Sequence, residues 1–278
     1  MANVPSKPTA PVKKESSSSS SIFATLAIPI CLIVSICVYI FFLGDSSHFK
    51  GGDPTNGDPA DVFGIVHKGG VLVPLVMGYV LMVIVFSIER FIVIGKATGT
   101  SSIETFVRKI QTFLSSGNID AATAECDKQK GSVANVIKAG LKKYREMETD
   151  DTMDIGQKAL AIQKDIEEAT ALEMPMLEQN LTIIATLVSI GTLTGLLGTV
   201  VGMIKAFAEL ANNGGGTNTG ALSAAISEAL VNTALGISTS ALSIIMYNVF
   251  TSKIDNLTYA IDETGFSIVQ TYAASHKK

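Results

Sequence analysis

The residues best suited to chemistry in this sequence lie within one of its most apolar stretches. Positions 221–250 are ALSAAISEALVNTALGISTSALSIIMYNVF, and Glu228 is the one charged residue among them. A charged side chain in a membrane-spanning helix costs about 2.5 to 3.5 kcal/mol on insertion scales, so it usually faces a bundle interior or an aqueous cavity. At roughly 100° per residue, Glu228 shares a helix face of about 80° with other small or polar residues. That face also holds Asn232, Gly236, Thr239 and Ser243, with Thr233 and Ser240 beside it.

Two explanations of Glu228 stay open. It follows the turn-forming stretch ANNGGGTNTG by only about eight positions, so hydration near the membrane surface could remove the cost of its charge. It could instead face a lumen. One carboxylate cannot form a proton relay, and one copy of the chain has too few helices to enclose a pore. We therefore expect a homo-oligomer with a partner segment that supplies a second acid. A proton crossing about 100 mV would release about 2.3 kcal/mol, enough to bias a conformational step.

The preceding apolar stretch carries a stripe of glycines. Within TLTGLLGTVVGMIKAF, positions 192–207, each glycine would cost a soluble helix roughly 1 kcal/mol relative to alanine. In a membrane, small residues at such spacing let helices approach closely, so we predict helix packing. Thr192 and Thr199 lie beside this stripe, where a hydroxyl can bond the carbonyl one turn back or line a polar path. The predicted packing residues are Gly191, Gly195, Gly198 and Gly202.

The composition indicates a membrane protein. Of 278 residues, 47% are hydrophobic and only 17% are charged, with mean hydropathy +0.39, whereas soluble domains average about 25% charged. Four apolar runs are long enough to cross about 30 Å of hydrocarbon, and the first, 22–43, is too long for a cleaved signal peptide. A net charge of −4 argues against a nucleic-acid partner. The cysteines and histidines are scattered and no phosphate-binding loop or zinc motif is present, so we expect no enzyme activity, metal or cofactor.

The distribution of basic residues predicts the orientation. Lys and Arg number eleven in 96–178 but two in 44–69 and none in 206–220, which places the long segment and both termini on the cytoplasmic side. The long segment shows helical spacing. We expect one of its helices to start with Ser102 as N-cap, and its last helix to run on into the third span with a bend at Pro175.

The predicted fold is all-α, a polytopic inner-membrane protein with four transmembrane helices whose long helices extend into a cytoplasmic bundle. The lipid bilayer is expected to replace much of a conventional core. The expected segments are a disordered cytoplasmic tail at 1–21, transmembrane helices at 22–43, 70–95, 179–210 and 221–252, a periplasmic connector at 44–69, a cytoplasmic helical domain at 96–178, a periplasmic turn at 211–220, and a cytoplasmic C-terminal helix and tail at 253–278.

Three motifs of the chain resemble one known family. They are IERF at 88–91, GLLGTVVGMIKAF at 195–207 and SEALVNTALGISTSALSIIMYNVF at 227–250. In this order and with a large polar segment before the last two, they are similar to the MotA/TolQ/ExbB proton-channel family, and most like ExbB. The additional N-terminal helix is similar to that of ExbB-type proteins of Bacteroidota. Thr192 is a departure, because members of this branch often have proline there.

The resemblance implies an inner-membrane pentamer around a dimer of a single-span, ExbD-like partner, whose aspartate carries protons through the pore. By motif position, Thr199 and Thr233 match pore-facing hydroxyls next to that aspartate, and Glu228 matches the acid on the lumen side. Thr192, Asn232 and Thr239 are further candidates for pore-facing positions.

The function that the resemblance implies is a motor subunit, which converts proton motive force into mechanical work on a TonB-like protein for outer-membrane nutrient import. The alternative within the family is a TolQ-like envelope-maintenance subunit or a gliding or flagellar stator subunit. Two other classes predict different behaviour. A structural anchor would tolerate Thr199→Ala and Glu228→Ala, and a secondary transporter would show repeated halves, which this sequence lacks.

Overall fold

The chain is almost entirely helical where its structure is described. The computed structural model describes residues 17–55, 57–212 and 219–276. Residues 1–16 of the predicted tail lie outside this part, whereas 17–21 begin the first helix, and most of the predicted turn at 211–220 also lies outside it. The helices are α1 (Ser17–Cys37), which continues as a π-helix (Val38–Leu43), a 3-10 turn (Ser46–His48), α2 (Val62–His67), α3 (Leu72–Thr98), α4 (Ile103–Ser115), α5 (Ile119–Gln129), α6 (Gly131–Glu148), α7 (Ile155–Glu178), α8 (Leu181–Asn212) and α9 (Thr219–Ser275).

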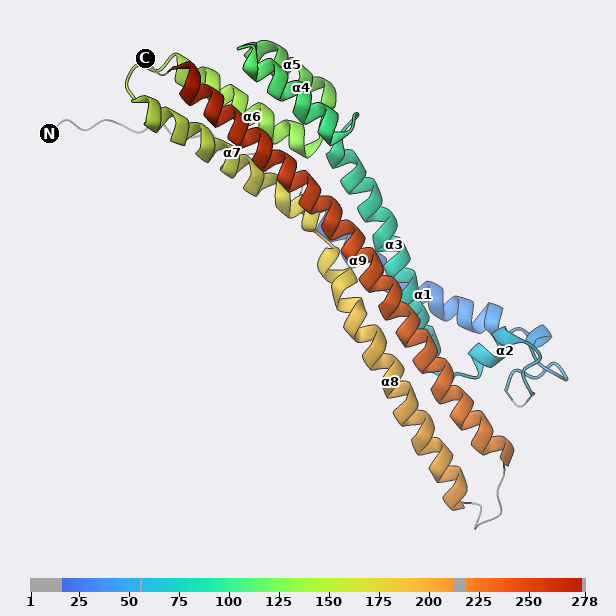
Figure 1. Cartoon of the computed structure of the whole chain (residues 1–278). Coiled ribbons are helices and arrows are strands. Elements are labelled where there is room, and N and C mark those ends of the chain that lie inside the picture. Colours follow the sequence, from blue (N-terminus) through green and yellow to red (C-terminus); the bar gives the residue numbers. More distant parts are fainter. Residues whose placement is uncertain (1–16, 56, 213–218, 277–278) are drawn as a thin grey trace.

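One helix, α9, runs along nearly the whole molecule (Figure 1). It has 57 residues, which extend about 85 Å at 1.5 Å per residue. It continues without a break past position 252, where the sequence analysis placed the end of a transmembrane helix. α8 packs along one half of α9, while α4, α6 and α7 pack around the other half (Figure 1). α9 therefore connects the candidate membrane hairpin to the helical bundle as one continuous rod.

Four helical stretches each contain a window of 18 residues that is apolar enough to cross a membrane. They are Ile22–Leu43, Leu72–Ser115, Ile155–Ala211 and Leu222–Ser275. The prediction of an all-α chain with four candidate membrane-spanning helices is therefore confirmed. Large apolar side chains such as Leu193, Ile204 and Ile245 are exposed on α8 and α9, as expected of helices that meet lipid or other subunits.

Helices α4, α6 and α7 pack around the C-terminal half of α9 and form the bundle. α4 begins where the Ser102 hydroxyl accepts the N–H of Thr105, so the predicted N-cap is confirmed. α7 begins with a capping box, in which Asp154 and Gln157 each accept the backbone N–H of the other. Buried apolar side chains from these helices and from α9 form one core, including Phe106, Ile110, Leu114, Ile137, Leu141, Ile162, Ile261 and Ile268.

The break between α7 and α8 lies beyond the residue that was expected to bend the chain. Pro175 is inside α7, which ends at Glu178. The chain turns at Asn180, whose φ of 64° lies in the left-handed region that asparagine tolerates better than most residues. The prediction that one helix runs into the third span with a bend at Pro175 is therefore wrong. A proline removes one helical donor, but this helix ends where its last carbonyls find a donor elsewhere.

Arg90 on α3 is that donor. Its Nη1 lies 3.1 Å from the carbonyl oxygen of Leu177 and 3.3 Å from that of Met176, two carbonyls in the last turn of α7. Its Nε and Nη2 donate to the two carboxylate oxygens of Glu89, and the Arg90 side chain is only 1% exposed. The Asn180 amide also reaches Glu89, at 3.5 Å. The Glu89–Arg90 pair thus ties α3 to the α7–α8 break.

Packing in the bundle is expected to make the thiol of Cys126 unreactive, which labelling can test. Cys126 on α5 is buried, and this burial raises the pKa of its thiol to about 12. At pH 8 roughly one molecule in ten thousand would carry the reactive thiolate, so we expect Cys126 to resist maleimide in the folded chain and to react in denaturant. Mass spectrometry of the labelled peptides measures both rates. Equal rates with and without denaturant would contradict the packing around α5.

Candidate functional site

The glycine stripe brings the backbones of α8 and α9 into contact. A Cβ atom on Gly195 would lie 3.1 Å from Gly236 Cα, and a Cβ atom on Gly236 would lie 2.6 Å from the carbonyl oxygen of Gly191. The stripe continues with Gly198 against Asn232 and with Gly202 against Ala229. All four glycines that the sequence pattern selected therefore lie in the α8–α9 interface, where a side chain would push the helices apart.

Hydroxyl groups pair across the same interface. Thr233 Oγ1 on α9 donates to the carbonyl oxygen of Gly195 on α8 at 3.0 Å. The hydroxyl oxygens of Thr192 and Ser240 lie 2.7 Å apart. α8 continues through Thr192 without a break. Thr192 and Thr233 thus link the two helices.

Thr199 lies on a different side of α8. Its Oγ1 donates to the carbonyl oxygen of Leu196 in the same helix, at 2.6 Å. Thr199 lines a shallow apolar hollow on the outside of the molecule together with Val200, Met203, Ile204 and Phe207. The structure therefore does not gather the three predicted proton-path residues at one point. Thr199 faces outward, whereas Thr233 lies between the helices.

Glu228 lies between three parts of the chain. Its Oε1 is 2.5 Å from the Nζ of Lys205 on α8, and the Glu228 side chain is 16% exposed while that of Lys205 is 51% exposed. Gly70, just before α3, packs so closely on the Glu228 carboxylate that a Cβ atom would not fit between them. The carboxylate is therefore paired with a cation on one side and covered by backbone on the other.

Asn232 and Thr239 are enclosed by their own chain. The Asn232 side-chain nitrogen donates to the carbonyl oxygen of Gly69 at 2.6 Å and to that of Glu228 at 3.0 Å, and Asn232 is only 1% exposed. Thr239 is fully buried and donates to the carbonyl oxygen of Leu235 at 2.8 Å. Within the chain these two candidates face neighbouring elements, because one face of α9 is covered by α8 and by the turn before α3.

Lys205 is the site residue that sequence reasoning missed. It lies 23 positions before Glu228, at the far end of the glycine-rich motif on α8. The sequence did contain a hint of this pair. Lys205 lies near the end of one apolar helix and Glu228 near the start of the next, and two antiparallel helices bring such positions together. Neither helical wheel shows this pairing alone, because it depends on the register of the two helices.

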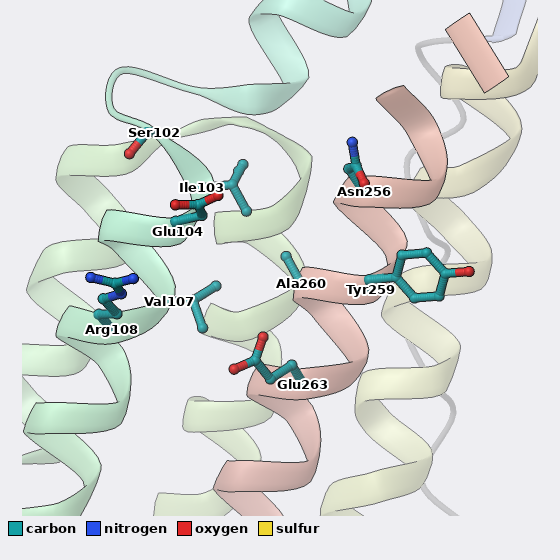
Figure 2. Close-up of a pocket in the computed structure, with 9 residues that line it drawn as sticks. All are labelled: Ser102, Ile103, Glu104, Val107, Arg108, Asn256, Tyr259, Ala260 and Glu263. Atoms are coloured by element: carbon teal, nitrogen blue, oxygen red, sulfur yellow. The ribbon is translucent and has the colours of Figure 1, made fainter. Parts of the chain in front are cut away.

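A second concave surface lies far from Glu228, in the bundle. A groove of about 630 Å³ runs between α4 and α9, and Figure 2 shows Val107, Ala260 and Glu263 facing its interior. Arg108 and Tyr259 point away to opposite sides in the same view. The lining is Ser102, Ile103, Glu104, Val107, Arg108, Asn256, Tyr259, Ala260 and Glu263. It contains no histidine or cysteine, and Glu263 accepts a hydrogen bond from Gln111 at 2.9 Å.

The fold and the site together define a multi-pass membrane protein, in which the last two spans form a closely packed hairpin with a paired carboxylate at one end. Residues 128–263, just under half of the chain, match the MotA/TolQ/ExbB proton channel family. The match covers the α8–α9 hairpin and includes Thr199, Glu228 and Thr233.

Individual relatives agree with this family. The chain is 33% identical over 88 residues to ExbB-like protein 3 of Synechocystis sp., which is 31% of this chain and 42% of that protein. It is 36% identical over 88 residues to ExbB-like protein 1 of the same organism, which is 31% of this chain and 35% of that protein. It is 23% identical over 210 residues to the Tol-Pal system protein TolQ of Pseudomonas aeruginosa, which is 74% of this chain and 89% of TolQ. The ExbB-like matches thus cover less than half of those proteins.

Proposed function

We propose that the chain is an ExbB-like subunit of a proton-driven motor in the bacterial inner membrane, with both termini in the cytoplasm. Five copies would surround a dimer of an ExbD-like, single-span partner, and proton flow would drive work on a TonB-like protein for nutrient import. The observation that carries the proposal is Glu228, the one charged residue of positions 221–250, whose carboxylate is paired with Lys205 of α8 within the family-matched region. Intramembrane carboxylates of this kind mark proton and ion pathways.

The proposed path runs along the outer surface of α8, and Thr233 lies close to it in the α8–α9 interface. Thr199 lies on the outside of α8, where a partner helix or a second protomer would supply the other wall of a path. Thr233 offers a hydroxyl in the α8–α9 interface, five positions after Glu228. A pore between protomers is consistent with this placement, because one α8–α9 pair is too tightly packed to hold a channel.

Replacing Glu228 with glutamine is the direct test. We would co-express the chain with its genomic neighbour, measure the mass of the purified complex, and record proton leak in liposomes. We expect Glu228→Gln to preserve the complex and to change the leak, because the amide cannot take up and release protons. Glu168→Gln is a matched control, since Glu168 is 65% exposed in a loose pair with Lys164 at 3.7 Å. An identical proton leak in wild type and Glu228→Gln would mean that Glu228 and the polar residues on its face of α9 serve only in helix packing.

A TolQ-like role in envelope maintenance is the second candidate, because the match to TolQ extends over 89% of that protein. The two roles differ in what a deletion strain loses. Loss of TonB-type uptake with normal resistance to detergent would favour the ExbB-like role. Detergent sensitivity with normal uptake would favour the TolQ-like role.

A further inference from the structure

The Glu228 carboxylate is held by two groups to which the proposed function assigns no part. The first is the Lys205 ammonium, 2.5 Å from Glu228 Oε1. Hydrogen bonds between ionised partners are shorter and stronger than neutral ones. Both residues lie on the same end of the α8–α9 hairpin, so the pair also closes the two helices against each other there.

The second group is the tight turn Gly69–Gly70, between α2 and α3. Gly70 has a φ of 81°, a left-handed conformation that favours glycine, and it packs against Oε1 and the carboxyl carbon of Glu228. A Cβ atom on Gly69 would lie 2.9 Å from a methyl group of Val231. The Asn232 amide donates to the Gly69 carbonyl at 2.6 Å. The Gly69–Gly70 turn therefore packs on α9 at Glu228. Asn232, one helical turn further along α9, holds it there by its hydrogen bond to Gly69.

The first apolar helix, residues 17–43, packs against α3, and we call this pair the N-terminal hairpin. It fixes the position of the Gly69–Gly70 turn. The Tyr39 hydroxyl donates to the carbonyl oxygen of His67 at 3.0 Å, and the two rings stack with centroids 4.6 Å apart. Deeper in the hairpin, the fully buried Ser35 donates to the carbonyl oxygen of Pro74 on α3 at 2.7 Å. Both ends of the Gly69–Gly70 turn are therefore attached to the first apolar helix, which lies outside the family-matched residues.

We propose that Lys205 and the Gly69–Gly70 turn are positioning groups for Glu228, and that the N-terminal hairpin serves to hold this turn in place. Lys205 keeps the carboxylate paired and aimed across the α8–α9 interface, and the turn blocks its other rotamers. This inference rests on the proposed function, because a positioning group has an effect on proton flow only if Glu228 takes part in it.

A chemical cross-link tests the ion pair directly. A water-soluble carbodiimide activates a carboxylate, and an adjacent amine then forms an amide while the carbodiimide leaves as a urea. In the purified full-length complex we expect a Lys205–Glu228 amide, detected by mass spectrometry as a joined peptide pair with the mass of one water lost. The exposed Lys164–Glu168 pair, at 3.7 Å, provides an internal reference for yield. Absence of the Lys205–Glu228 product from a sample that contains the reference product would overturn the proposal.

Proton flux tests the positioning role. The Lys205 side chain is 51% exposed, so solvent weakens its charged hydrogen bond to Glu228, and we expect Lys205→Gln to lower flux roughly five- to tenfold. Lys205→Arg should retain most of the flux. The double variant Lys205→Glu with Glu228→Lys keeps an ion pair but places the acid on α8. We expect its complex to have the wild-type mass and its proton flux to stay low, because α9 then carries no acid. Flux in Lys205→Gln equal to that of Lys164→Gln would overturn the proposal.

The turn has a matched control. Gly70→Ala puts a Cβ atom against Glu228, whereas Gly51→Ala introduces the same strain at a nearly identical φ of 82° with nothing within 4 Å. We expect Gly70→Ala to lower both flux and the yield of the Lys205–Glu228 cross-link, and Gly51→Ala to change neither. Equal behaviour of the two variants would overturn the role of the turn. If Glu228→Gln leaves flux unchanged, the proposed function fails. If Glu228→Gln changes flux while Lys205→Gln does not, only the positioning role fails.

Discussion

Replacing Arg90 with alanine is expected to destabilise the protein by about 3 to 5 kcal/mol, the range observed when one partner of a buried ion pair is removed. Arg90 is 1% exposed and binds both oxygens of Glu89. The substitution leaves Glu89 without its cation and the carbonyls of Met176 and Leu177 without a donor. Both sets of lost contacts lie at the α7–α8 break, so we expect α7 to separate from α3 as the first step of unfolding.

Thermal loss of helical circular dichroism in detergent measures this effect, and a decrease in the midpoint on the order of 10 °C is expected. Arg108→Ala, on the exposed face of α4, is the matched control. The double variant Glu89→Gln with Arg90→Met should recover part of the loss, because a buried pair can be replaced by neutral groups at much lower cost than a single charge can be left behind. A midpoint for Arg90→Ala equal to that of Arg108→Ala would contradict a structural role for this network.

The elements that the sequence predicts well are those determined by local pattern. Apolar runs of about 20 residues identify candidate membrane helices by length and composition, and each of the four predicted runs lies in a helix of the structure. Ser102 was identifiable as an N-cap because its hydroxyl bonds a backbone N–H only three residues away. The glycine stripe on α8 was also visible, because the period of the helix places these residues on one face whatever the partner helix is.

The features that the sequence did not predict depend on contacts between distant segments. The end of α7 is set by Arg90, 87 positions before Leu177, rather than by the nearby Pro175. Lys205 pairs with Glu228 because of the register of α8 on α9. Asn232 was singled out by its polarity, but a helical wheel could not show that the turn at Gly69 already accepts its amide. Periodicity identifies the faces of a helix, and only the assembled chain shows what covers each face.

Replacing Gly236 with leucine is expected to separate α8 from α9 and to cost more than about 3 kcal/mol, the upper range for overpacking, because the obstacle is backbone on both sides. The first carbon alone would lie 2.6 Å from the carbonyl oxygen of Gly191 and 2.7 Å from Gly195 Cα. Flexible side chains could move aside, but these atoms belong to the α8 helix itself. The Thr233 hydrogen bond to the Gly195 carbonyl, one turn away, would break as the helices separate.

Gly95→Leu is the matched control, because Gly95 is also helical but has nothing within 4 Å of a Cβ atom and is exposed on α3. We expect Gly95→Leu to purify as wild type, and Gly236→Leu to lose its thermal transition and its co-purifying partner together. The joint loss follows from the geometry, since the same interface positions Glu228 and Thr233 and presents the outer face of α8 with Thr199. A Gly236→Leu chain that keeps its midpoint would mean that α8 and α9 do not meet at these glycines, and the arrangement of the whole candidate site would have to be redrawn.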